Sequence, residues 1–253
     1  MPLIADGTRW LLKASNPGAR QRLLCFPHAG GSPQLFESWS RAWPDVEVAV
    51  VVLPGRSHRF GEPCFQSVQE AASAALGALR GYVLERPCVV FGHSLGAFVA
   101  FEFLKRLGPA PGLHFVPSGA QAPPRAPRHE AGLHQLDDER LLQALSGLRG
   151  TPPEILARPD LMKALLPMLR SDVRMAETYV NEDPACLTCD LTAFVGLSDP
   201  VAPFEKCAGW QEFTQGQFAL RAFDGDHFFL QSDEAALLDA LRQCLDTLPA
   251  TRS

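Results

Sequence analysis

The stretch Val89-Val90-Phe91-Gly92-His93-Ser94-Leu95-Gly96-Ala97 changes character within a few residues. A short apolar run stops at Gly92, and a longer one without glycine or proline continues to Leu107. The first run suits a buried strand and the second suits a helix. Gly92 and Gly96 flank Ser94, which indicates a turn too tight for side chains at those two positions. The stretch therefore predicts a strand, a sharp turn and a helix, with the Ser94 hydroxyl held out beside the backbone N–H groups of the helix start.

The length suits one large domain or two small ones, and the composition is that of a soluble globular protein. We expect a single domain over residues 1–253. The formal net charge is −5 and there is no long basic run, so nucleic acid is disfavoured as a partner. No apolar stretch is long enough to cross a bilayer. The first residues, 1–6, also lack the basic start and apolar core of a signal peptide. We expect neither a nucleic-acid nor a membrane partner.

The cysteines point to a reducing compartment. There are seven, an odd number scattered along the chain, which fits the cytoplasm better than a secreted disulfide framework. Cys186 and Cys189 have a C-x-x-C spacing, but no second pair or nearby histidine accompanies them. We expect two ordinary thiols there and no metal site.

Strand patterns alternate with helical patterns along most of the chain. The turn at Ser94 is called the elbow below. The strand that leads into it, from about residue 87 to 91, is preceded by a helical pattern from Phe65 to Val83. Another helix is expected from a cap at Ser232 to Leu248. This alternation predicts the α/β class, with a mostly parallel sheet and helices on both faces. The other expected strands are Arg22–Phe26, Val46–Leu53, Leu113–Val116, Leu191–Val195 and Phe218–Phe223.

The alternation is interrupted from about residue 121 to 180. Helical segments occur here without a strand between them, broken by prolines. A helical insertion between sheet strands is typical of a lid over the serine, and a peripheral helical hairpin is the alternative. The expected breaks are Pro152, Pro153, Pro159 and Pro167.

Ser94, Asp199 and His227 follow predicted strands in the order nucleophile, acid, base. That order is the one found in α/β-hydrolases. His227 would take the proton of the weakly nucleophilic hydroxyl, and Asp199 would fix the imidazole tautomer. Asp226 is a rival acid, although adjacent residues seldom face each other as such a set requires. His28 precedes the serine, and in this fold the base comes last, so we do not assign it as the base.

An oxyanion site is expected from two backbone N–H groups. One belongs to Leu95, the residue after the nucleophile. The other belongs to Ala29, in a loop that follows an early strand and contains Gly30 and Gly31. The alternative for that loop is a simple strand-to-helix turn.

Taken together, the chain resembles the stand-alone type II thioesterases of nonribosomal peptide and polyketide assembly lines. Two lid stretches match as well, residues 148–152 and 166–172. Members of this family hydrolyse aberrant acyl groups from the phosphopantetheine arm of carrier protein domains. The resemblance implies an α/β-hydrolase fold, thioesterase activity in the cytoplasm, carrier domains as partners and no cofactor; we further expect a monomer. The resemblance rests on five blocks: Cys25–Ser32, Leu53–Arg56, Phe91–Ala97, Gly196–Pro200 and Asp226–Phe229.

The chain departs from that family at Asp226, where many members have glycine, and at Ser57–Arg59. Three other functions remain open. A medium-chain acyl carrier thioesterase and a carboxylesterase or lipase would share the chemistry. A binding module on a hydrolase scaffold is disfavoured by the intact candidate residues. Arg125, Arg128 and His129 are candidates for contact with an acidic carrier, or they merely solvate a proline-rich loop.

Overall fold

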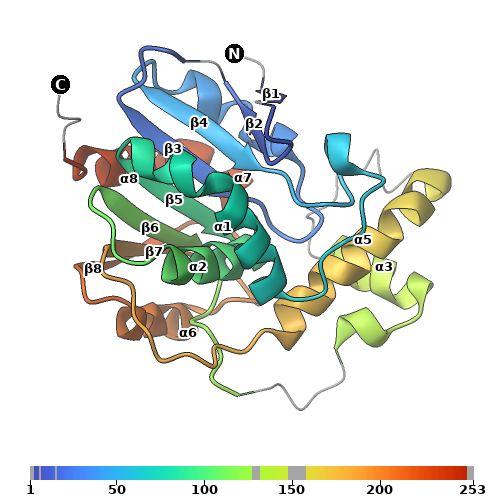
Figure 1. The fold of residues 1–253 in the computed structure, drawn as a ribbon. Helices are drawn as coiled ribbons and strands as arrows, with labels where there is room; N and C mark the ends of the chain where they lie inside the picture. Colours follow the sequence, from blue (N-terminus) through green and yellow to red (C-terminus); the bar gives the residue numbers. More distant parts are fainter. Residues whose placement is uncertain (1–2, 6, 15, 127–131, 148–157, 250–253) are drawn as a thin grey trace.

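The computed structural model describes residues 3–5, 7–14, 16–126, 132–147 and 158–249. Its centre is an eight-stranded sheet in the order β1-β2-β4-β3-β5-β6-β7-β8 (Figure 1). β1 pairs antiparallel with β2, and β2 with β4, whereas all the other neighbours are parallel. The strands are β1 (Ile4–Ala5), β2 (Leu11–Lys13), β3 (Gln21–Phe26), β4 (Val46–Val51), β5 (Cys88–His93), β6 (Leu113–Ser118), β7 (Asp190–Gly196) and β8 (Phe218–Phe223).

Helices cover both faces of this sheet (Figure 1). One face carries α1 (Val68–Glu85) and α2 (Leu95–Leu107), and the other carries α8 (Glu234–Asp246). Short helices α6 (Phe204–Ala208) and α7 (Phe229–Ser232) follow β7 and β8. Single turns of 3-10 helix begin at residues 33, 39, 57, 133 and 209. Within the described ranges, no helix combines the length and apolar character needed to cross a membrane.

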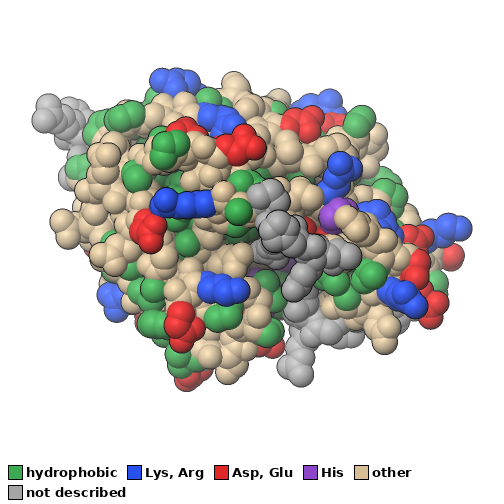
Figure 2. Space-filling model, turned by 90° about the horizontal axis from the view of Figure 1, so that it is seen from below, with side chains coloured by type: hydrophobic (Ala, Val, Ile, Leu, Met, Phe, Trp, Pro, Cys, Tyr) green, Lys and Arg blue, Asp and Glu red, His purple; other side chains and the backbone are tan. Residues whose placement is uncertain are grey.

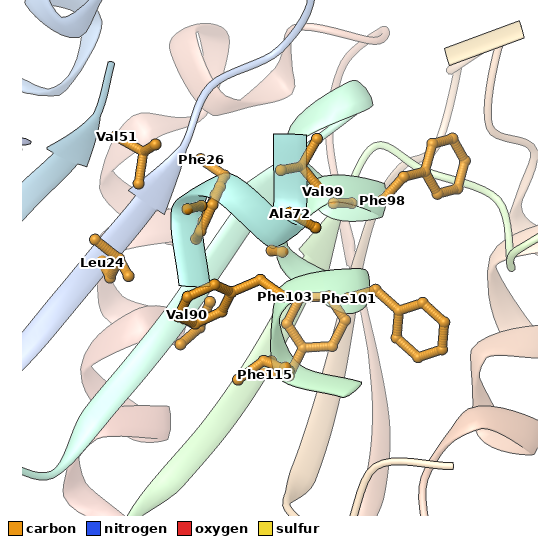
Figure 3. Packing of buried hydrophobic residues seen from close by; sticks show 14 of the residues in the cluster. Leu24, Phe26, Val51, Ala72, Val90, Phe98, Val99, Phe101, Phe103 and Phe115 are labelled. Atoms are coloured by element: carbon orange, nitrogen blue, oxygen red, sulfur yellow. The ribbon is translucent and has the colours of Figure 1, made fainter. Parts of the chain in front are cut away.

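Alternating strand residues divide the core into two layers. Leu24 and Phe26 of β3 pack beneath α1 and α2, whereas Leu23 and Cys25 point to the layer with α8. Figure 3 shows the first layer, in which Phe103 of α2 lies over the sheet. Because both faces are covered, β4, β5 and β6 are buried along their whole length, whereas the edge strand β8 is largely exposed or half-buried. The predicted α/β class with a mostly parallel sheet is confirmed.

Two local predictions were wrong. Ser232 does not cap the last helix, because it ends α7, and Asp233 is the residue that precedes α8. Pro167 does not break the inserted helix. It lies inside α5 (Pro159–Thr178), which continues because eight of its side chains are buried, and this packing outweighs the hydrogen bond that proline removes. Pro159 occupies the first position of α5, where proline is well tolerated.

The insertion between β6 and β7 contains α3 (Asp138–Gly147) and α5. Figure 1 shows both helices beside the sheet, past the ends of the central parallel strands. Pro152 and Pro153 lie outside the described residues. The antiparallel pair β1 and β2 was not predicted from the sequence.

Candidate active site

Ser94 lies in a strained turn between β5 and α2. Its φ is +54° and its ψ is −119°, a conformation that is rare for a residue with a side chain. Both flanking glycines are required by space. A Cβ at Gly92 would lie 2.4 Å from the carbonyl oxygen of Gly96, and a Cβ at Gly96 would lie 2.0 Å from that of Phe26. The turn therefore holds only with glycine at both positions, as the sequence pattern indicated.

The structure brings Ser94, His227 and Asp199 together in series. The His227 Nδ1 lies 2.8 Å from Asp199 Oδ2, and its Nε2 lies 3.1 Å from Ser94 Oγ. Since a carboxylate only accepts, Nδ1 carries the proton and Nε2 is free to accept the serine hydroxyl. His227 and Asp199 are both buried. This arrangement can deliver a serine alkoxide to a carbonyl and store the proton on the imidazole.

Asp199 is held by its own turn. Its Oδ1 accepts the backbone N–H groups of Val201 at 2.8 Å and Ala202 at 3.1 Å, which leaves Oδ2 for His227. Asp226, the rival acid, instead accepts the backbone N–H of Phe228 at 2.9 Å. Asp226 therefore stabilises the turn that carries the histidine, whereas Asp199 is the carboxylate in contact with the imidazole.

His93 supports the site from beneath, a role that the sequence did not suggest. Its Nε2 lies 3.0 Å from the carbonyl oxygen of His227, and its Nδ1 lies 2.9 Å from the Ser118 hydroxyl. Complete burial lowers the pKa of His93 well below its ordinary value, and the neighbouring His227 and His28 lower it further. His93 is therefore neutral, with Nε2 donating and Nδ1 accepting.

The loop after β3 presents three backbone N–H groups near the elbow. Those of Gly30 and Gly31 already have acceptors, namely Asp172 Oδ2 at 2.7 Å and the carbonyl oxygen of His28 at 2.8 Å. Those of Ala29 and Leu95 have no acceptor among the described residues. These two groups are therefore the ones available to a bound oxyanion.

Comparison with known proteins identifies the family of the chain. A family model described as the thioesterase domain matches residues 21–245. The chain belongs to the thioesterase family. This thioesterase is similar to Thioesterase PikA5 of Streptomyces venezuelae, with 41% identity over 234 residues, which cover 90% of the chain and 83% of the relative. It is also similar to the medium-chain S-acyl fatty acid synthase thioesterase of Rattus norvegicus, at 32% identity over 240 residues and 91% and 90% coverage.

Among solved structures, the thioesterase is similar to the type II thioesterase BorB from the borrelidin biosynthetic cluster. The TM-score is 0.83 at 32% identity, and the match covers 94% of this chain and 98% of BorB. The likeness therefore includes both the sheet and most of the insertion that carries α3 and α5.

Two further residues of this thioesterase, Arg56 and Asp172, approach the site without having been predicted there. Arg56 follows the turn after β4, and Asp172 lies in α5. Sequence spacing gives no sign that they meet, because a charged residue in a helix is usually solvated. Their sequence signal is that Arg56 lies in the block Leu53–Arg56 and Asp172 in the lid stretch 166–172, both of which match the family.

Proposed function

We propose that this chain is a type II thioesterase that hydrolyses acyl thioesters on carrier proteins of a nonribosomal peptide or polyketide synthase. The observation that carries the proposal is the contact series Ser94–His227–Asp199 in a chain of the thioesterase family. The resemblance to BorB, a type II thioesterase of a biosynthetic cluster, supports the pathway class.

The proposed reaction uses a serine nucleophile. Ser94 Oγ attacks the thioester carbonyl while its proton passes to His227 Nε2, and Asp199 stabilises the resulting imidazolium. The Ala29 and Leu95 N–H groups stabilise the tetrahedral oxyanion. Collapse breaks the carbon–sulfur bond, the thiol leaves with the proton, and an acyl-serine ester remains. Water, deprotonated by His227, then hydrolyses the ester and restores the serine.

We propose the cytoplasm as its compartment. All seven cysteines are free thiols, and four of them are buried. Burial raises the pKa of Cys88 and of Cys207 to about 12, so these thiols are unreactive packing residues. Such cysteine usage supports a reducing environment.

The protein is acidic overall, so its net charge does not attract an acidic carrier domain. Recognition of the carrier therefore requires a local basic surface. Figure 2 shows acidic and basic side chains interspersed on one face of the protein, outside the grey atoms. Arg125 is one candidate contact. It is exposed, pairs with Glu212 at 2.8 Å and lies 5.5 Å from the centre of the Phe213 ring. Arg128 and His129 lie outside the described residues.

A labelling experiment tests the chemistry. A fluorophosphonate probe should modify wild-type protein at Ser94, and Ser94→Ala should abolish both labelling and thioester hydrolysis. Labelling without any hydrolysis of acyl thioesters would contradict a thioesterase and favour an oxygen esterase. No labelling at all would favour a binding module.

A substrate comparison tests the carrier. We expect a higher kcat/KM for an acyl carrier protein than for the same acyl group on coenzyme A. Arg125→Glu with Arg128→Glu should weaken only the carrier reaction, in a salt-dependent way, because the lost attraction is electrostatic. Arg221→Glu, at an exposed arginine of β8, is the control. Equal efficiency on both substrates would contradict carrier recognition and favour a thioesterase for free acyl thioesters.

A further inference from the structure

One carboxylate of α5 contacts two separate segments of the hydrolase body. Asp172 Oδ2 accepts the backbone N–H of Gly30 at 2.7 Å, in the loop that carries Ala29. Asp172 Oδ1 accepts Nη2 of Arg56, also at 2.7 Å. The side chains of Asp172 and Arg56 are 1% and 6% exposed, so this ion pair is sheltered from water. The insertion is therefore connected directly to the proposed oxyanion loop.

Stability alone is a weak explanation for this pair. Burying two charges costs several kcal/mol for each ion, and well-packed apolar residues often replace such a pair without loss. Aspartate is also a poor helix former, and Asp172 lies within α5. Moreover, Arg56 Nε is buried and has no acceptor among the described residues. An arrangement this costly is better explained by what it positions.

Two loops approach α5 so closely that a side chain would not fit at their glycines. Gly30 has a φ of +71°, and a Cβ there would lie 2.5 Å from Leu169 Cδ2. Gly55 has a φ of +85°, and a Cβ there would lie 3.0 Å from Met168 Cγ. Each loop thus has a glycine in the left-handed backbone conformation at the point where α5 approaches it. Asp172 supplies the polar contact in the same region.

We propose that Asp172 is a positioning residue for the oxyanion loop, residues 27–31, and that it makes turnover depend on the seating of α5. Its carboxylate fixes the peptide between Ala29 and Gly30, and thereby the orientation of the adjacent Ala29 N–H. Arg56 holds the carboxylate in place for that contact. The inference rests on the proposed function, because Ala29 is assigned there as an oxyanion donor.

The test separates the Gly30 contact from the ion pair. Arg56→Gln removes the buried cation, so that a neutral residue at position 172 no longer leaves a charge unpaired. In that background, Asp172→Asn (the amide double variant) keeps a side-chain oxygen for the Gly30 N–H, whereas Asp172→Ala (the methyl double variant) removes it. Ser171→Ala is the matched control, because Ser171 is the adjacent buried residue and its hydroxyl donates to the Phe65 carbonyl oxygen at 2.5 Å instead.

The amide double variant is the reference for this comparison, because it lacks the ion pair but keeps an oxygen that can accept the Gly30 N–H. The methyl double variant should lose about 10- to 100-fold in kcat with little change in KM, less than the roughly 10²- to 10³-fold cost of removing an oxyanion donor outright. Ser171→Ala should lower the Tm and leave kcat unchanged. Equal kcat for the two double variants, or a loss confined to KM, would overturn the proposal.

The rate of fluorophosphonate labelling keeps this inference separate from the proposed function. Phosphonylation of Ser94 also needs the oxyanion site, but it needs no thioester. If wild-type protein is labelled but hydrolyses no thioester, the proposed function fails. Slower labelling of the methyl double variant than of the amide double variant would then still support the positioning role, and equal labelling rates would overturn it.

Discussion

His93 Nε2 donates a hydrogen bond to the backbone carbonyl oxygen of His227 across 3.0 Å. This contact joins the end of β5, which precedes Ser94, to the loop that follows β8. The Ser118 hydroxyl on β6 satisfies the other ring nitrogen of His93. Nucleophile and base are thus held in register through a buried neutral histidine rather than through the sheet alone.

We predict that His93→Gln retains much more activity than His93→Ala. The glutamine amide can still donate to the His227 carbonyl oxygen, whereas alanine leaves that acceptor unpaired in the core. The unpaired group costs about 1–3 kcal/mol. If this cost raises the activation free energy by displacing the His227 imidazole, kcat falls by about 10- to 100-fold. Steady-state kinetics of folded variants measures the difference. Equal losses in both would show that ring packing, not the hydrogen bond, is what matters.

Protein stability should fall as the pH drops below about 6.5, the ordinary pKa of histidine. Burial lowers the pKa of both His93 and His114 in the folded protein. Unfolded chains therefore bind more protons below this pH, and protonation favours unfolding. Each histidine should contribute a slope of about 1.4 kcal/mol per pH unit until its folded pKa is reached.

Denaturant titrations at pH 7.5 and 5.5 measure that slope. His93→Gln should reduce it by the share of one histidine, while His114 continues to contribute through its buried contacts with Thr192 and Thr247. A slope unchanged by His93→Gln would contradict the assignment of His93 as a buried neutral group.

The two aspartates near His227 should respond differently to neutralisation. Asp199→Asn should lower kcat by about 10⁴-fold, because an amide at this position favours the wrong imidazole tautomer. Asp226→Asn should have little effect, since an amide oxygen can still accept the Phe228 N–H. If Asp226→Asn is the inactive variant and Asp199→Asn turns over normally, the acid has been assigned wrongly.

Two glycines of neighbouring helices should give opposite results on substitution by alanine. Gly77 is exposed in α1 and has open space where a methyl group would lie, so Gly77→Ala should stabilise the protein by about 0.5–1 kcal/mol without changing activity. Gly96→Ala should abolish folding or activity, because its methyl group would overlap the Phe26 carbonyl oxygen. Thermal denaturation and labelling of Ser94 check both variants.

The parts of the site that were predictable are those encoded locally. Gly92 and Gly96 flank Ser94 within five positions, so the turn and its strand and helix could be read from the pattern. Asp199 and His227 each follow a strand, and parallel strands bring such residues to one edge of the sheet.

Contacts between distant segments were not predictable. Asp172 meets Gly30 and Arg56 only because α5 packs against the loops that follow β3 and β4, and nothing near Asp172 in sequence signals a buried charge. Ser232 failed as a helix cap for a related reason. The Asp226 turn and the burial of Phe229 and Leu230 start α7 early, and Asp233 is left to precede the last helix.

The two ends of α5 contact different parts of the protein. Its later part contacts the catalytic body through Asp172, and Tyr179, the residue after α5, donates its hydroxyl to Glu102 of α2 at 2.8 Å. Its earlier part packs with α3, where Met162 and Leu166 meet Leu142 and Leu145. Substitutions in α3 and at the start of α5 should therefore change kcat less than substitutions around Asp172, because only the latter would disturb the contact with the Gly30 N–H.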